Sequence, residues 1–172
     1  MDFVETLKTE SSRALVDLVA SAVGNNPTHF KTVFDLCFES HYPVSMRASW
    51  VIQACCENYP ELINPYIHNL FEKIKDSKID GVKRNFLKII SEYTELKQIE
   101  DAGLLIDTCF NCLYSPDSAI AIKYYSMNII YRYCEIEPDL KNEFCVVLEE
   151  ITEHSSKGLK SRIGKILKEL KT

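Results

Sequence analysis

One spacing of apolar residues recurs five times along this chain, and it restricts the fold more than any other feature. Ala48, Val51, Ile52 and Cys55 follow steps of three, one and three residues, which places them on one stripe of an amphipathic helix. The other four copies are Leu15, Leu18, Val19 and Ala22; Phe86, Ile89, Ile90 and Tyr93; Ser126, Ile129, Ile130 and Tyr133; and Ile163, Ile166, Leu167 and Leu170. Successive second members lie 33, 38, 40 and 37 residues apart. This period predicts an array of helical repeats.

The connecting segments repeat with the stripes. The segment "NNP" at 25–27 lies 33 residues before "NYP" at 58–60, and "EIEPDL" at 135–140 lies 78 residues after "ENYPEL" at 57–62. In each case the proline falls where it can open the next helix, because the N–H that proline lacks has no partner there anyway. The repeated unit is therefore predicted to be helix, short turn, helix.

These boundaries predict an all-α chain. We expect first helices over 28–40, 61–75, 101–114 and 138–153, and second helices over 10–24, 44–58, 79–94, 118–134 and 158–171, with residues 2–8 as a truncated first helix. A single hairpin cannot bury its apolar stripe, whereas stacked copies share one continuous core. We therefore expect a single domain over residues 1–172.

The opening of the second helices resembles that of a known repeat class. "YPVSMRASW" at 42–50 places a proline and then an arginine ahead of the small and apolar positions, and similar openings surround Arg84 in "IDGVKRNF" and Arg162 in "GLKSRIG". On these residues the chain resembles the HEAT/armadillo class of helical repeats. That resemblance implies a right-handed α-α superhelix, a HEAT-like solenoid, of about five hairpins, with the second helices lining a concave surface. The signatures of tetratricopeptide and ankyrin repeats are absent.

Trp50, the only tryptophan, leads to the candidate binding site. At 100° per residue it lies roughly 160° from the centre of its helix's stripe, beside Met46, Gln53 and Glu57. The resemblance places that side on the concave groove, although Trp50 could also pack half-buried against the adjacent second helix. When the repeat register is carried across, the predicted groove residues are Arg47, Trp50, Arg84, Lys88, Tyr124, Tyr125, Asn128 and Arg132.

Composition limits the environments in which the chain could work. Its formal net charge is −5 and its pI is near 5.4, so the average surface does not favour nucleic acid or an anionic membrane. The N-terminus shows no secretory signal, and no apolar run reaches the roughly 18 residues of a membrane helix. We expect a cytoplasmic protein with no membrane partner; nothing in the sequence indicates an oligomeric state.

No combination of residues predicts catalysis, a cofactor or a metal. The seven cysteines sit in apolar runs, as reduced thiols used for packing would, and the Cys109–Cys112 C-x-x-C has no second ligand pair at zinc spacing. The four histidines occur singly, and no HExxH, G-x-S-x-G, P-loop or dinucleotide-binding glycine motif is present. We expect a chain that is not an enzyme.

Two functions remain open at this point. The first is a non-enzymatic protein–protein interaction module that holds a partner segment in the groove, because aromatic and arginine side chains suit binding hot spots. The alternative is nucleic-acid binding, with phosphates contacted by Arg47, Arg84, Lys88, Arg132, Arg162, Lys165 and Lys168. Alkylated-base DNA glycosylases of HEAT-like shape use an aspartate and a tryptophan near the lesion. This chain offers only Asp17, one unit away from Trp50.

Overall fold

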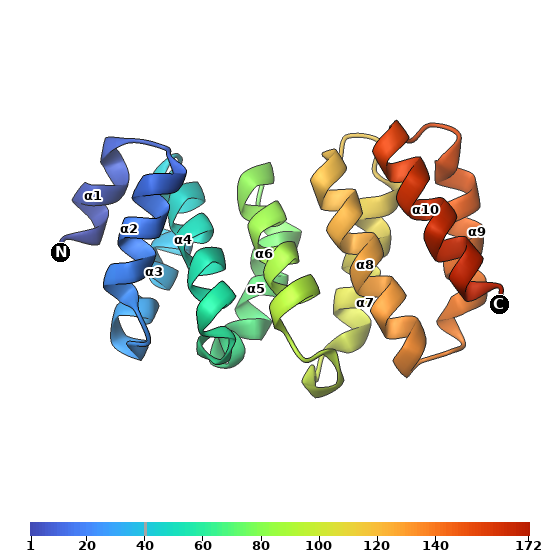
Figure 1. The fold of residues 1–172 in the computed structure, drawn as a ribbon, viewed down its shortest axis with the longest axis horizontal. Helices are drawn as coiled ribbons and strands as arrows, with labels where there is room; N and C mark the ends of the chain where they lie inside the picture. The colour runs from blue at the N-terminus through green and yellow to red at the C-terminus, as the bar shows by residue number, and fades with distance from the viewer. Residues whose placement is uncertain (40) are drawn as a thin grey trace. The chain divides into compact units, whose positions relative to one another are not determined.

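The computed structural model describes residues 1–39 and 41–172, and over these residues it is helical, with ten α-helices, two 3₁₀-helices and no strand. The all-α prediction is confirmed. The chain divides into two compact units, residues 1–94 and residues 95–172, which are described separately below (Figure 1). That residues 1–172 form a single domain stays a prediction.

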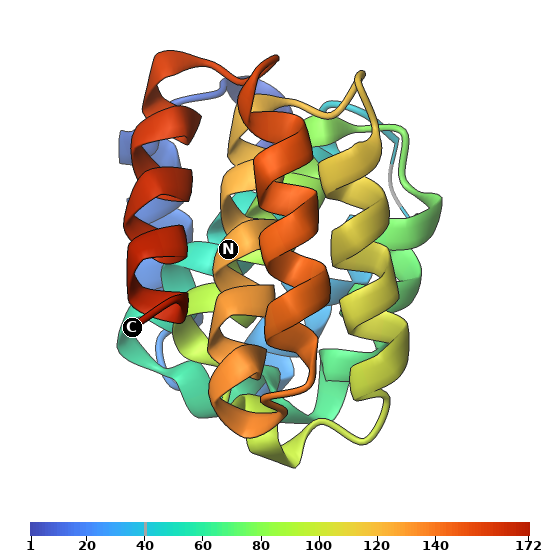
Figure 2. The ribbon, with the colours of Figure 1, turned by 90° about the vertical axis from the view of Figure 1, so that its right-hand side faces the viewer.

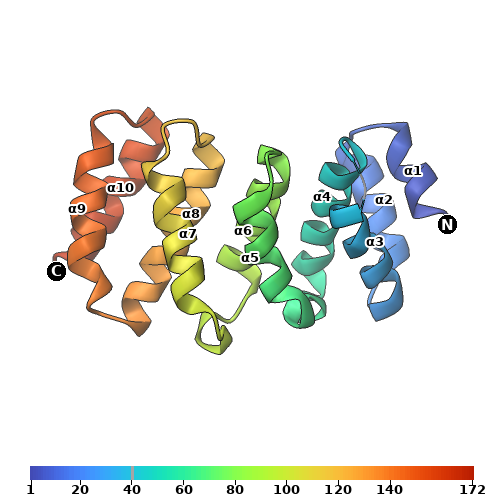
Figure 3. The ribbon, with the colours of Figure 1, turned by 180° about the vertical axis from the view of Figure 1, so that it is seen from behind.

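Unit 1 consists of two layers of helices. Its elements are α1 (Phe3–Thr9), α2 (Arg13–Val23), α3 (Pro27–Glu39), α4 (Val44–Asn58), the 3₁₀-helix η1 (Pro60–Tyr66), α5 (Ile67–Asp76) and α6 (Asp80–Tyr93). The second helices α2, α4 and α6 lie side by side in Figure 1, and α3 and α5 cover their other side, as Figure 3 shows from behind. The helix–turn–helix unit is therefore present as predicted.

Every predicted helix of unit 1 is found, and one of them is interrupted. Residues 61–75 were expected to be one helix, but η1 occupies the first part and α5 begins only at Ile67. Pro65 explains the difference, because its ring has no N–H to bond to the carbonyl of Glu61 and would collide with it in an α-helix. The predicted helix 28–40 is α3, and its last residue, Ser40, lies outside the described residues.

Helix α4 forms the centre of unit 1. Ten of its fifteen residues are buried, although the sequence predicted a single apolar stripe with a polar opposite side. The expected stripe is confirmed, with Ala48, Val51 and Ile52 fully buried and Cys55 only 2% exposed. Small side chains around the rest of the helix let α1, α2, α3 and α6 all pack against it. Neighbours on several sides, rather than one, account for the extra burial.

The predicted stripe of α2 is partly wrong. Leu18 was placed on it, but its side chain is 55% exposed, and Ala22 is only half-buried. The buried side chains of α2 are instead Leu15, Val16, Val19 and Val23. The apolar side of α2 packs mainly against α4, and the seven-residue α1 covers less of it.

Unit 2 also consists of two packed pairs of helices. Its elements are the 3₁₀-helix η2 (Leu96–Gln98), α7 (Ala102–Tyr114), α8 (Ile120–Ile136), α9 (Leu140–Thr152) and α10 (Lys157–Leu170). Seen from the C-terminal side in Figure 2, α9 and α10 lie next to each other with α7 and α8 behind them. The buried hydroxyl of Tyr133 donates to the carbonyl of Leu96 at 3.3 Å, which fixes η2 against α8.

At one equivalent position of α4, α6 and α10, the side chain donates a hydrogen bond to the preceding hairpin. This position lies four residues before the second member of each apolar stripe and is occupied by Arg47, Asn85 and Arg162. Arg47 Nη1 donates to the carbonyl of Leu7 at 2.7 Å, and Asn85 Nδ2 donates to Ser49 Oγ at 2.9 Å. Arg162 Nε donates to Oδ1 of Asn128 at 2.9 Å. The bonds join α4 to α1, α6 to α4 and α10 to α8.

We predict that Asn85→Ala lowers the free energy of unfolding of unit 1 by about 1–3 kcal/mol, because it leaves the buried Ser49 hydroxyl without its donor. Chemical denaturation followed by far-UV circular dichroism measures the loss. The control is Asn69→Ala, an exposed asparagine within α5, which should change the free energy by less than about 0.5 kcal/mol. Equal effects of the two substitutions would contradict the role of this hydrogen bond.

Candidate functional site

A connected set of charged groups lies on the side of α2, α4 and α6 that faces away from α3 and α5. Arg13 Nε lies 2.8 Å from Asp17 Oδ1 on α2, and Arg13 Nη2 reaches across to Glu57 Oε2 on α4 at 3.2 Å. From α6, Lys88 Nζ lies 3.8 Å from Glu57 Oε1 and 3.9 Å from Glu92 Oε2. Glu57 therefore links all three second helices of the unit.

The environment of Glu57 holds its carboxylate in the ionised form. Burial alone raises the pKa, but hydrogen bonds from Gln53, at 2.7 Å, and from Arg13, together with the charges of Arg13 and Lys88, outweigh it. The net pKa therefore lies below the ordinary value of 4.5. Glu57 is therefore an ionised carboxylate that is bonded within α4 and to both neighbouring second helices.

The four predicted groove residues of unit 1 lie on α4 and α6, which pack against each other. Trp50 is half-buried and shares one side of α4 with Gln53 and Glu57, three and seven residues further on. Arg84 is exposed, and its guanidinium points to the neighbouring Asn85 with both contacts at 3.3 Å. Of the predicted groove residues of unit 1, Trp50 and Arg84 are thus the two whose side chains remain accessible to a partner.

The other two predicted members in unit 1 make internal contacts. Arg47 is half-buried with one nitrogen on the Leu7 carbonyl, and its Nε is buried without a hydrogen-bond partner among the described residues. Lys88 is engaged with Glu57 and Glu92 and is only 25% exposed in its side chain. Both residues tie helices together, and the charge of Lys88 is balanced by the two carboxylates.

In unit 2 the four predicted groove residues all lie on α8. Tyr124 is 39% exposed, and its ring meets that of the half-buried Tyr125 edge-on, with centroids 5.3 Å apart. Asn128 and Arg132 are half-buried, and Asn128 accepts the hydrogen bond from Arg162. That these four residues continue one groove with the four of unit 1 stays a prediction.

A second cluster in unit 2 joins α8 to α10 beside Asn128. The Arg162 guanidinium stacks over the ring of Tyr131, 5.6 Å from its centroid, and the Tyr131 hydroxyl donates to Glu169. The hydrogen bond to Glu169 is the main reason that the pKa of Tyr131 is raised. The sequence predicted Arg162 as a phosphate contact. In the structure its guanidinium already stacks on the Tyr131 ring and donates to the side-chain amide oxygen of Asn128.

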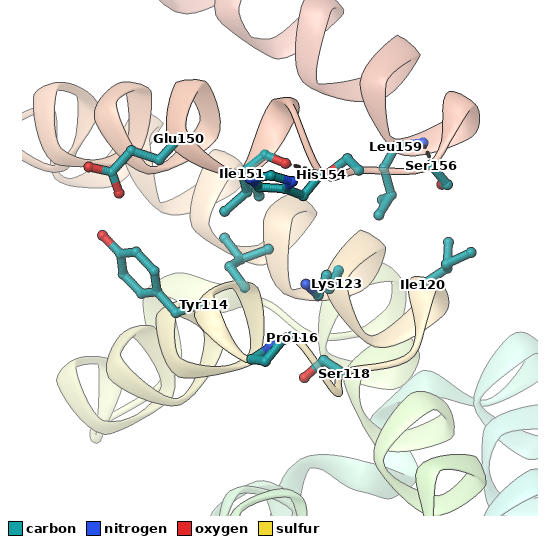
Figure 4. Close-up of a pocket in the computed structure, with 12 residues that line it drawn as sticks. Tyr114, Pro116, Ser118, Ile120, Lys123, Glu150, Ile151, His154, Ser156 and Leu159 are labelled. Carbon is teal, nitrogen blue, oxygen red and sulfur yellow. Dashed lines mark hydrogen bonds between the residues drawn. The ribbon is translucent and has the colours of Figure 1, made fainter.

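Two pockets accompany these surfaces. The first, of about 480 Å³, lies between α2 and the end of α4 and is lined by polar groups including Arg13, Asp17, Glu57 and Tyr59. The second, of about 560 Å³, lies in unit 2 where α7 ends, α8 begins, α9 ends and α10 begins (Figure 4). Its lining is largely apolar, with Tyr114, Ile120 and Ile151 among its members.

The sequence reasoning missed the pocket in unit 2. Its lining comes from helix ends and connecting segments, where a helical period no longer gives the direction of side chains. A signal was nevertheless present, because the predicted turn and the helix ends on either side of it carry Tyr114, Pro116 and Ile120 rather than polar residues alone. Tyr114 is 54% exposed and Ile120 is 59% exposed.

The cysteines are mostly inaccessible thiols. Cys37, Cys55, Cys56, Cys109 and Cys134 are buried, whereas Cys112 and Cys145, which also lie in apolar runs of the sequence, are half-buried. Burial raises the pKa of Cys55 to about 12 and that of Cys134 to about 11. Burial likewise raises the pKa of Cys37, Cys56 and Cys109 well above the usual range.

Over the described residues, no group of three or more histidine, cysteine, aspartate or glutamate side chains is arranged to hold a metal ion. The absence of a metal or cofactor in the functioning protein stays a prediction. Within the same residues, no helix combines the length and apolar character needed to cross a membrane.

Comparison with known proteins gives one finding. The sequence pattern of the HEAT repeat domain matches residues 3–170, which is nearly the whole chain and extends over both units. No curated protein and no solved structure matches the chain.

We predict that a thiol reagent labels only Cys112 and Cys145 rapidly in the native protein, because burial protects the other five thiols and disfavours the reactive thiolate. Thiol counting with and without denaturant, followed by mass spectrometry of the labelled peptides, measures this. The Cys112→Ser, Cys145→Ser double variant should lose the rapid phase. Rapid labelling of Cys37 or Cys109 in the native state would be inconsistent with the core described above.

We predict that Glu57 contributes stability that is complete above pH 4.5 and is lost as the pH falls through its lowered folded-state pKa. Wild-type protein should therefore lose more stability between about pH 4.5 and pH 3 than Glu57→Gln, which has no proton to take up there. Denaturation midpoints across this range measure the difference. Parallel pH profiles for the two proteins would show that the native state does not favour the ionised carboxylate.

Proposed function

The chain belongs to the HEAT repeat domain family, and we propose that it is a non-enzymatic module that binds a segment of a partner protein along its second helices. HEAT repeats generally mediate protein–protein interaction. The binding surface of unit 1 would comprise Trp50 and Arg84, supported by the charged network around Glu57.

The half-buried position of Trp50 is the observation that carries this proposal. Its helix is held by four neighbouring helices, so its backbone is fixed before any partner binds. A large aromatic group on a rigid support loses little conformational entropy on binding, which is a common property of binding hot spots. Ion pairs beside it involve Arg13, Glu57 and Lys88, and these would form a polar rim around the aromatic anchor.

The same contacts argue against phosphate as the ligand. Of the basic side chains expected to contact nucleic acid, Arg47, Lys88 and Arg162 each already have a partner inside their own unit. Carboxylates of Asp17, Glu57 and Glu92 lie on the same side and would repel a polyanion. A protein segment carrying both apolar and polar groups fits this mixed surface better.

The proposal includes the absence of catalysis and a cytoplasmic location. The HEAT repeat family typically provides non-enzymatic scaffolds. The carboxylate most central to the surface, Glu57, is held ionised rather than poised for proton transfer. The cytoplasmic location rests on the seven free cysteines, which suit a reducing compartment.

We predict that Trp50→Ala weakens binding of the partner by about 2 kcal/mol or more, roughly thirtyfold in Kd, because it removes the buried aromatic anchor. The tagged full chain and its variant would be used to capture partners from native extract after nuclease treatment. Affinity for the captured protein would then be measured by calorimetry over a range of salt concentrations.

The matched control is Phe38→Ala, which removes another half-buried aromatic side chain of unit 1, on α3, where it packs under the Lys73 ammonium. That variant should bind as wild type does, although it loses comparable packing. Equal retention of the partner by Trp50→Ala and wild type would mean that Trp50 serves packing alone. Nuclease-sensitive capture with a steep salt dependence would favour nucleic acid instead.

A further inference from the structure

The pocket in unit 2 contains a lysine without a counter-ion. Lys123 is half-buried on the pocket wall, and among residues 1–39 and 41–172 its ammonium has neither an ion pair nor a hydrogen bond. Glu150 lines the same pocket, and in the part of the chain that the structure describes no ion pair joins it to Lys123. By contrast, the side chain of Lys88 is also half-buried, but its ammonium contacts two carboxylates.

The position of Lys123 in its helix adds to the positive potential at the pocket wall. It is the fourth residue of α8, so its charge lies next to the positive end of the helix dipole. Residue 119, the N-cap, is an alanine that makes no side-chain hydrogen bond to the first turn. One external anion at the pocket wall would pair with this charge.

Apolar groups surround this charge. Leu113 and Leu159 are buried beneath the pocket, and Tyr114 and Ile120 are two of the most exposed large apolar side chains in the described chain. Figure 4 shows Lys123 between the segment that carries Pro116 and Ser118 and the helix end that carries His154. A ligand for this site therefore needs an apolar body and a negative group close to it.

We propose that this pocket binds a segment of a partner protein that inserts an apolar side chain next to a carboxylate, with the carboxylate paired to Lys123. The volume of about 560 Å³ would accommodate a large apolar side chain and its neighbours. A partner segment is favoured over a small organic acid because Tyr114 and Ile120 extend the apolar surface to the pocket's exposed margin. A small acid bound inside would leave them uncovered. This site is separate from the Trp50 surface and does not depend on it.

The test uses short random peptides displayed on phage and selected on the immobilised full chain. Peptides that also bind Lys123→Glu are removed by counter-selection on that variant. We expect the remaining peptides to share an aspartate or glutamate next to a large apolar residue. Synthetic copies should bind wild type with a Kd at least about tenfold lower than for Lys123→Glu or Ile120→Ser, because each variant removes one half of the recognition.

The matched control is Lys160→Glu, which makes the same charge change at the fourth residue of α10, on an exposed side chain outside the pocket. It should bind the peptides within about twofold of wild type, as should Trp50→Ala, since both leave the pocket intact. Circular dichroism checks that every variant is folded. Selected peptides without an acidic residue, or equal binding by Lys123→Glu and Lys160→Glu, would overturn the proposal. Saturation of the pocket by free aliphatic carboxylic acids with the same Lys123 dependence, in the absence of any peptide consensus, would overturn the choice of a protein segment.

Discussion

The packing around α4 determines how unit 1 can be built. Ala48, Ser49, Ala54, Cys55 and Cys56 have small side chains, and they allow helices on several sides to approach this one helix closely. The approach is tight at the start of α6, where a Cβ added to Gly81 would lie 2.6 Å from Cγ of Met46. Since burial on all these sides uses nearly the whole helix surface, only a narrow strip containing Trp50 remains for other purposes.

The charged groups of the second helices follow from the same geometry. Once α2, α4 and α6 lie side by side, long polar side chains on their common side come within reach of one another. Arg13, Glu57 and Lys88 then form pairs between helices rather than within one. A surface that looks basic when its residues are read along single helices therefore becomes mixed and mostly neutral in the folded unit.

Much of the fold could be predicted because it depends on a repeated local pattern. The recurring apolar stripes located every α-helix, whereas the 3₁₀-helix before Pro65 and the exposed Leu18 on α2 departed from the pattern. The candidate site was less predictable. The repeat register assigns Arg47 and Lys88 to the correct helices, but it cannot show that the carbonyl of Leu7 or the carboxylate of Glu57 already occupies them. The pocket beside Lys123 arises from helix ends, which a periodic pattern does not describe.

The hydrogen bonds donated by Arg47, Asn85 and Arg162 give the stacking of hairpins a polarity. In each case the donor belongs to the later hairpin and the acceptor to the earlier one. Removing either hairpin of a pair breaks the same bond, and the freed donor or acceptor then faces water. Stability in repeat proteins is approximately a sum of the stabilities of the repeats and of the interfaces between neighbours. A substitution at this position therefore weakens the interface with the earlier hairpin and leaves the interface with the later one unchanged, so that each interface within a unit can be altered separately.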